Sequence, residues 1–197
     1  MRLYMNNESF SQTKTSSKFP PIFLVGMMGS GKSYWCKAIA RQLNFGGVDL
    51  DAQIEKVYQQ SIAAIFNEKG ETFFREKEAA ELRTFSNKNS VVVATGGGTP
   101  CFHDNMLWMN QHGITIWIDE PVHTLAERLL KEKSHRPLVA NFENTAALTH
   151  FLSEKLAERS RFYGKADIHL KGEQLQIETM ITAIQSFENK QFNINQS

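Results

Sequence analysis

Residues 26–33 read GMMGSGKS and match the pattern GxxxxGK[ST] at every fixed position. They follow the apolar run 21–25 and precede a segment with helical periodicity, which is the context that this phosphate-binding motif requires. Its glycines let backbone N–H groups point at phosphate oxygens, and the helix N-terminus adds the positive end of its dipole. Lys32 can reach the β- and γ-phosphates, and the Ser33 hydroxyl can hold Mg²⁺. We therefore predict a nucleotide-binding loop formed by Gly29, Ser30, Gly31, Lys32, Ser33 and Tyr34.

A glycine-rich turn with a chance Lys-Ser pair is the alternative to a phosphate site. Because Gly accounts for about 7% of residues, the four fixed positions arise by chance in roughly one chain of this length per hundred or fewer. The chain contains no NKxD sequence, which guanine-binding GTPases usually carry, and its 197 residues are too few for the extra domains of most motor ATPases. These observations favour a small-molecule kinase.

Two carboxylates, Asp49 and Asp51, follow the second predicted strand at its C-terminal end. This is the edge at which open α/β sheets bind ligands. Residues two apart in an extended segment point the same way, so both carboxylates can face one cleft. One would then lie near Mg²⁺ and the other near a substrate hydroxyl. The alternative is that the pair only caps a helix beginning at Ala52.

Three consecutive glycines, Gly96, Gly97 and Gly98, follow the apolar segment 90–95. Such a sequence permits close approach of the backbone and leaves N–H groups for an anion. A flexible turn explains it equally well.

Short apolar runs alternate with helical periodicity along the chain. The clear strands are 21–25, 90–95 and 114–118, and weaker ones lie near 48–49 and 168. The alternation predicts an α/β protein whose parallel sheet is covered by helices on both faces. The predicted helices are 32–43, 52–58, 61–68, 73–85, 105–111, a helix starting at 121, 145–162 and 177–187.

The composition is that of a single globular domain. Lys and Arg total 22 against 21 Asp and Glu, and this near balance argues against nucleic acid as the partner. No apolar run approaches the ~18 residues of a membrane span. The two cysteines show no CxxC spacing, which favours reduced thiols in a cytoplasmic protein. We predict a polar, flexible extension at 1–19, one kinase domain at 20–188 and a polar tail at 189–197.

Several motifs follow one another in a fixed order along the chain. They are GMMGSGKS, Asp49-Leu50-Asp51 with Ile54-Glu55, segment 61–66 with Gly70-Glu71, Phe74-Arg75 with Glu78, the triple glycine, Arg136-Pro137-Leu138, and Arg159 with Tyr163. This ordered set resembles the shikimate kinase family, and order and spacing agree over residues 21–170. The resemblance implies a three-layer α/β/α P-loop kinase fold of the nucleoside-monophosphate-kinase type. Its five-stranded parallel sheet would have the order 2-3-1-4-5, and a short lid would span about 131–143.

This resemblance implies ATP-dependent phosphorylation of the 3-hydroxyl of shikimate, with Mg²⁺, in aromatic amino-acid biosynthesis through chorismate. Asp51 would orient or deprotonate the hydroxyl, while Ser33 and Asp49 would bind the metal. Lys32 and Arg136 would stabilise the transferring phosphoryl group, to which such an arginine can add about 10³–10⁵ in rate. Arg136, in the lid, would also contact the nucleotide. A cytoplasmic monomer that binds neither nucleic acid nor membrane is the expected form.

The resemblance also implies a clamp for the substrate carboxylate. Arg75 and Arg159 would bind it together with backbone N–H groups around Gly97, because Arg offers planar, charge-assisted hydrogen bonds. Glu78 would hold Arg75 in place. Without the resemblance, Arg75 would be interpreted as an exposed helix residue in i,i+4 pairs, and Arg159 as a surface helix residue beside Arg161. Phe66, Phe74 and Pro137 would wall the ring, and Arg128 is a candidate for contact with adenine.

Two alternatives stay open from the sequence. A gluconate kinase on the same fold would share the phosphate loop but needs no pair of carboxylate-binding arginines. A nucleotide-binding regulatory domain without catalysis is opposed by the full set of site residues.

Two departures from the family pattern concern the nucleotide: segment 171–174 lacks the usual basic sequence, and Tyr34 stands where Thr is common.

Overall fold

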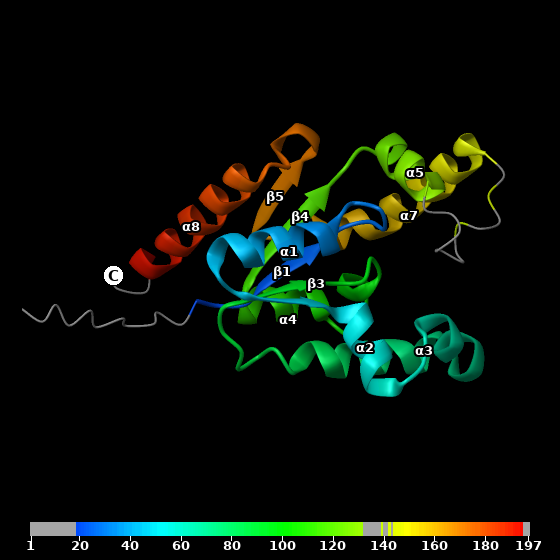
Figure 1. Cartoon of the computed structure of the whole chain (residues 1–197), viewed down its shortest axis with the longest axis horizontal. Helices are drawn as coiled ribbons and strands as arrows, with labels where there is room; N and C mark the ends of the chain where they lie inside the picture. Colours follow the sequence, from blue (N-terminus) through cyan, green and yellow to red (C-terminus); the bar gives the residue numbers. More distant parts are fainter. Residues whose placement is uncertain (1–18, 132–138, 140–141, 143, 195–197) are drawn as a thin grey trace, which may run out of the picture.

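The computed structural model describes residues 19–131, 139, 142 and 144–194 (Figure 1). Within these residues, a five-stranded sheet has the order β2-β3-β1-β4-β5, and every neighbouring pair is parallel. The prediction of an α/β fold with this strand order is therefore confirmed. The strands are β1 (Ile22–Val25), β2 (Gly46–Asp49), β3 (Val91–Ala94), β4 (Ile114–Asp119) and β5 (Ile168–Lys171).

Helices cover both faces of the sheet because its central strand is apolar on both sides. Ile22 and Leu24 of β1 pack in one core with α1 and α8, whereas Phe23 and Val25 pack in a second core with α3, α4, α5 and α7. All four side chains are fully buried, as expected for a strand between two helical layers. The helices are α1 (Lys32–Leu43), α2 (Leu50–Tyr58), α3 (Ile62–Arg83), α4 (Asn105–His112), α5 (Val122–Lys131), α7 (Thr145–Tyr163) and α8 (Ile177–Ile194).

Three helices differ from the sequence prediction by two residues or more. The two helices predicted at 61–68 and 73–85 are joined in α3 across Gly70, whose φ of 81° and ψ of 171° are not helical. Helix α2 begins at Leu50 instead of Ala52, because the Asp49 carboxylate already caps it. Helix α8 runs to Ile194, well beyond the predicted end at 187. The polar residues after 187 predict a coil, but a polar composition is equally typical of the exposed face of a helix.

The carboxyl ends of the parallel strands meet at one edge of the sheet and place the site there. The phosphate loop follows β1, the triple glycine follows β3, and short 3₁₀ turns at Thr99–Cys101 and Gly172–Gln174 complete the edge. In the view of Figure 1, α2 and α3 lie below this edge and α5 and α7 lie above it. No helix in the described part of the chain is long and apolar enough to cross a membrane.

The predicted domain boundaries stay predictions. The extension at 1–19 falls outside the described residues except for Phe19, and so does the predicted lid apart from 131, 139 and 142. Arg136 and Pro137, which the resemblance assigned to the substrate and phosphoryl sites, also lie outside the described residues.

Candidate active site

The phosphate loop is closed by its own lysine. The Lys32 ammonium is buried and donates to the backbone oxygens of Gly26, at 2.9 Å, and Met27, at 2.8 Å. Gly29 and Gly31 have φ of 79° and 86°, a region that residues with a Cβ rarely adopt, so the glycines of the motif are required by the turn. The loop therefore has the tight backbone that phosphate binding needs.

Five of the six predicted nucleotide-binding residues in the loop line one cleft of about 720 Å³, and Ser30 is the exception. The Ser30 side chain is fully buried, and its Oγ has no hydrogen-bond partner among the described residues. Its backbone N–H donates to Met27 O at 3.2 Å. The Ser30 Oγ lies next to Gly26, since a Cβ there would be 3.4 Å from it.

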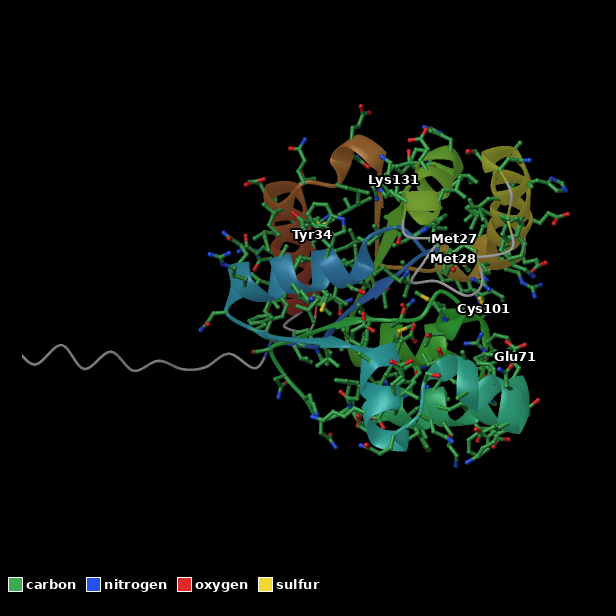
Figure 2. The ribbon with its side chains drawn as sticks, turned by 45° about the vertical axis from the view of Figure 1, so that its right-hand side comes forward. Met27, Met28, Tyr34, Glu71, Cys101 and Lys131 are labelled. Carbon is green, nitrogen blue, oxygen red and sulfur yellow. The ribbon has the colours of Figure 1, made fainter. Side chains whose placement is uncertain are left out.

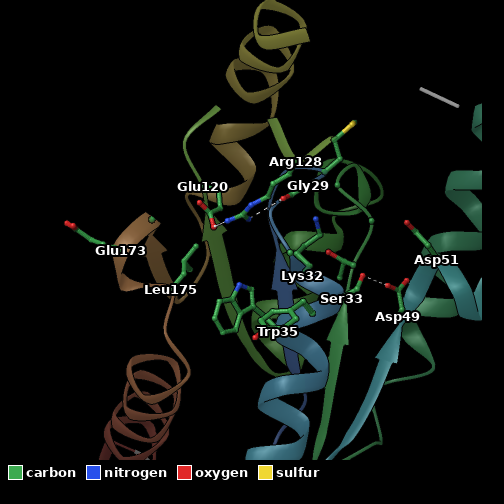
Figure 3. A pocket seen from close by; sticks show the side chains of 17 residues that line it. Gly29, Lys32, Ser33, Trp35, Asp49, Asp51, Glu120, Arg128, Glu173 and Leu175 are labelled. Carbon is green, nitrogen blue, oxygen red and sulfur yellow. Dashed lines mark hydrogen bonds and ion pairs between the residues drawn. The ribbon is translucent and has the colours of Figure 1, made fainter. Parts of the chain in front are cut away.

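Ser33 and Asp49 lie together at the mouth of the loop. The Ser33 hydroxyl donates to Asp49 Oδ2 at 2.5 Å, while Asp49 Oδ1 accepts the N–H of Ala52 at 3.3 Å (Figure 3). Asp49 is therefore both the helix cap and the partner of the phosphate-loop serine. A hydroxyl and a carboxylate are hard oxygen donors of the kind that Mg²⁺ takes, with waters and substrate phosphates as its other ligands. No cluster of three or more His, Cys, Asp or Glu in the described part of the chain forms a metal site of protein groups alone.

Asp51 faces the same cleft from the first turn of α2, so the extended geometry expected for the Asp pair is wrong, although both carboxylates reach the cleft. A Cβ on Gly96 would lie only 2.9 Å from Asp51 Oδ1. Burial raises the pKa of Asp51 to about 6, and the negative charges of Glu78 and Asp49 add to the increase. A carboxylate whose pKa is raised toward neutral pH suits a proton acceptor.

Arg75 is fixed against the triple glycine. Its Nη1 donates to Glu78 Oε2 at 2.8 Å, and its Nε and Nη2 each lie 3.1 Å from Glu71 Oε1. The guanidinium carbon lies 4.4 Å from the centre of the Phe102 ring. A Cβ on Gly98 would lie 2.5 Å from Arg75 Nη2, so only glycine admits the arginine here. With its side chain only 11% exposed, Arg75 is not the solvated helix residue that the sequence alone suggested.

Arg159 approaches the middle glycine from α7. A Cβ on Gly97 would lie 3.2 Å from Arg159 Nη1, and the buried Tyr163 donates its hydroxyl to Gly97 O at 2.5 Å. Burial raises the pKa of the Tyr163 hydroxyl, which therefore stays a donor at neutral pH. The three glycines thus each make room for a different side chain, and this excludes a merely flexible turn.

Glu78 connects the clamp to the turn after the glycines. Its fully buried carboxylate binds Arg75 through Oε2 and accepts the Thr99 hydroxyl at 2.6 Å through Oε1. The resemblance correctly paired Glu78 with Arg75. Thr99 was not predicted as a site residue, and its position just after the glycines was the one available signal in the sequence.

The cleft continues from the loop toward the ends of β4 and β5 (Figure 3). There Arg128 Nη2 binds Glu120 Oε1 at 2.8 Å, and Trp35 and Leu175 line the wall. Neither Trp35 nor Glu120 was predicted from the sequence as a site residue. Figure 2 shows the two ends of the site: Tyr34 lies on one side of Met27 and Met28, and Cys101 and Glu71 lie on the other.

A phosphate loop opens onto a cleft that two carboxylates and the triple glycine line, and two arginines lie against those glycines. This arrangement is that of a P-loop small-molecule kinase. Residues 28–188 match the family model described as shikimate kinase. A shikimate kinase of Phocaeicola vulgatus is 40% identical over 172 residues, which are 87% of this chain and 98% of the relative. One from Gloeobacter violaceus is 40% identical over 149 residues, 76% and 81% of the two chains. The chain belongs to the shikimate kinase family.

Solved structures agree with this assignment. The crystal structure of a shikimate kinase from Bacteroides thetaiotaomicron has a TM-score of 0.77 and 34% identity, and covers 86% of this chain and 97% of that one. A shikimate kinase from Acinetobacter baumannii, solved in complex with shikimate, has a TM-score of 0.73 and 29% identity, with coverage of 89% and 94%. The predictions of the family, the fold and the enzyme class are confirmed.

Proposed function

We propose that this chain transfers the γ-phosphoryl group of ATP to the 3-hydroxyl of shikimate, giving ADP and shikimate 3-phosphate. The observation that carries the proposal is the convergence of Asp51, Arg75 and Arg159 on the triple glycine beside the phosphate loop. Shikimate is a carboxylic acid with several hydroxyl groups on one ring. It therefore needs a cationic clamp at one end and a hydroxyl acceptor at the other. The solved relative that contains shikimate supports the same substrate.

Arg75 and Arg159 bind the substrate carboxylate in this proposal, with the Gly97 N–H beside them. The hydrogen bonds to Glu71 and Glu78 use one N–H each on Nε, Nη1 and Nη2 of Arg75. Since a guanidinium has five N–H groups, two are left on its terminal nitrogens for a carboxylate. The two glutamates thus orient Arg75 without consuming its binding capacity.

Asp51 accepts the proton of the attacking hydroxyl. With a pKa of about 6, its carboxylate is mostly ionised at pH 7. The hydroxyl oxygen forms the new bond to the γ-phosphorus, its proton passes to Asp51, and ADP leaves with the electrons of the broken P–O bond. Mg²⁺, when bound near Ser33 and Asp49, supplies positive charge to the phosphate oxygens. Lys32 contributes further charge from the loop, and Arg136 is proposed to act from the lid.

A coupled assay of ADP release with shikimate, gluconate and other polyhydroxy acids tests the proposal. We expect turnover that depends on ATP, Mg²⁺ and shikimate. Turnover with gluconate and none with shikimate would replace the proposal by the gluconate kinase alternative. ADP binding without turnover of any acceptor would favour a regulatory domain.

The Arg75→Ala variant tests the clamp. Removal of a buried, charge-assisted partner should raise the shikimate KM roughly 30-fold or more, while ADP affinity stays unchanged. Lys69→Ala removes an exposed cation from the same helix and is the matched control, with an expected change below about twofold. An unchanged shikimate KM in Arg75→Ala would exclude Arg75 from the clamp.

We also propose that the protein works in a reducing compartment such as the cytoplasm, and as a monomer. Cys36 and Cys101 are both free thiols, and Cys36 is buried with its thiol donating to Val92 O at 3.2 Å. This arrangement is suited to a compartment without disulfide formation. Sedimentation of the reduced protein with and without ADP tests the monomer.

A further inference from the structure

A second arginine of α3 binds the segment that follows the triple glycine. Arg83 lies about two helical turns beyond Arg75 on α3. Its Nη1 donates to the side-chain oxygen of Asn105, and its Nη2 donates to the backbone oxygen of His103 at 2.8 Å. The guanidinium carbon of Arg83 also lies over the ring of Trp108, 5.1 Å from its centre. The helix that carries the clamp arginine is therefore also attached to the start of α4.

The contacts of Arg83 hold a segment with an unfavourable backbone. His103 and Asp104 have φ of 48° and 54°, in the left-handed region that residues with a Cβ rarely adopt. Two such residues in succession keep this conformation only where their surroundings impose it. The hydrogen bond from Arg83 to His103 O acts on this conformation directly, so Arg83 helps to fix the position at which α4 begins.

Asn105, the first residue of α4, transmits this constraint to the turn after β3. Its side chain is fully buried, and both ends of its amide are used. The oxygen accepts from Arg83, and the nitrogen donates to Thr99 O at 2.8 Å. A buried amide that lost either partner would cost free energy, so the two bonds together hold Thr99 in place.

Thr99 connects Asn105 to the clamp. Its hydroxyl donates to Glu78 Oε1 at 2.6 Å, and Glu78 Oε2 accepts from Arg75 Nη1 at 2.8 Å. A continuous row of hydrogen bonds thus starts at Arg83, crosses the turn after β3 and ends at Arg75. Because the row begins and ends on the same helix, α3 and the turn are joined at two separate points, which opposes rotation about either one.

We propose that Asn105 and Arg83 are positioning residues, which act through this row of hydrogen bonds on the direction of the Arg75 guanidinium. The inference rests on the proposed function, in which Arg75 binds the carboxylate of shikimate. Asn105 is fully buried and cannot touch a substrate, so its effect on binding has to pass through the row. Such a contact requires placement within about 0.5 Å, and loss of this placement should weaken shikimate binding about tenfold.

The affinities for shikimate and for its neutral carboxamide, measured by calorimetry with ADP bound, separate positioning from stability. Asn105→Ala should weaken shikimate binding about tenfold but carboxamide binding less than about twofold, since an uncharged amide gains little from Arg75. Asn110→Ala is the matched control on the same helix, because that amide also uses both ends, with Lys165 O at 2.7 Å and the Thr115 hydroxyl at 2.8 Å. It should lower the melting temperature and leave both affinities unchanged.

A double-mutant cycle shows whether Asn105 acts through Arg75. In the Arg75→Ala background, Asn105→Ala should cause less than about twofold further loss of shikimate affinity. A full tenfold loss in that background, or equal losses for shikimate and the carboxamide in the single variant, would overturn the inference.

Asn105→Asp keeps the size of the side chain and the acceptor for Arg83, but it replaces the donor to Thr99 O by an oxygen. It should therefore show the same loss of shikimate affinity even if Asn105→Ala does not fold. The unmodified protein distinguishes the inference from the proposed function. If it binds no shikimate, the proposed function is wrong. If it binds shikimate and Asn105→Asp binds it equally well, only the positioning role is wrong.

Discussion

Asp51 lies in an environment that disfavours its ionised form. Burial and the charges of Glu78 and Asp49 raise its pKa to about 6, whereas Lys32 and Arg75 lower it. A carboxylate with this pKa is a better proton acceptor than an exposed aspartate and is still mostly ionised at pH 7. The same desolvation that prepares the group for chemistry destabilises the folded protein.

The Asp51→Asn variant should separate these two effects. A folded-state pKa above the unfolded value means that the stability is complete below about pH 4 and falls as the pH rises through about 6. Asparagine removes this loss, so the free energy of unfolding at pH 7 should increase by up to about 3 kcal/mol, with about half of that gain at pH 5. Urea unfolding at both pH values measures the difference.

The turnover of Asp51→Asn should fall although its stability rises. Loss of the proton acceptor should lower kcat by about 10²-fold or more. In the unmodified protein, kcat/KM for shikimate should rise with pH through about 6, in line with the pKa of Asp51. A variant that is both less stable at pH 7 and fully active would contradict the role of this carboxylate.

The turn that follows β3 is the element on which the substrate end depends. Gly98 has φ of −89° and ψ of −21°, which any residue can adopt, so the reason for glycine is space and not backbone conformation. The space is taken by the guanidinium of Arg75, which Glu78 and Phe102 keep in place. The turn and α3 therefore have to fit each other to form the clamp.

Gly98→Ala should damage the clamp without unfolding the protein. Its Cβ would lie 2.5 Å from Arg75 Nη2, so the arginine must move, and the shikimate KM should rise about tenfold. The melting temperature and the ADP affinity should change little, because the alanine backbone is unstrained. Gly46→Ala is the control, since the nearest atom to its Cβ is 3.8 Å away. Equal effects of the two substitutions on the shikimate KM would exclude the steric argument.

How far the site could be predicted from the sequence depends on whether each residue acts within one element or through contacts between elements. The phosphate loop could be predicted from local spacing because its function is built into eight consecutive residues. Arg75 and Arg159 could be predicted only through the family resemblance, because local pattern makes each an exposed helix residue. Trp35, which lines the cleft, was not predicted as a site residue, since apolar periodicity does not distinguish a wall of a cleft from a packed interior. The ion pair between Glu120 and Arg128 could not be predicted, because the fold and not a local sequence spacing brings the two side chains together.

Over the whole molecule, the balance of 22 basic and 21 acidic residues is repeated inside the site. Arg75 is paired with Glu78 and Glu71, and Arg128 with Glu120. The cleft is thus not a strongly positive funnel, although its substrates are anions. Pairing compensates the cost of burying each charge and leaves recognition to short hydrogen bonds of fixed direction.

This arrangement predicts a weak dependence of substrate binding on salt. A field from unpaired cations would be screened as the Debye length falls from about 14 Å at 50 mM salt to about 6 Å at 300 mM. Contacts made at hydrogen-bond distance are screened much less, so the shikimate KM should rise less than about threefold over this range. Steady-state kinetics with saturating ATP measures it, and a constant kcat at saturating shikimate excludes inactivation by salt. A tenfold rise in KM at constant kcat would show that long-range attraction, and not the paired clamp, dominates binding.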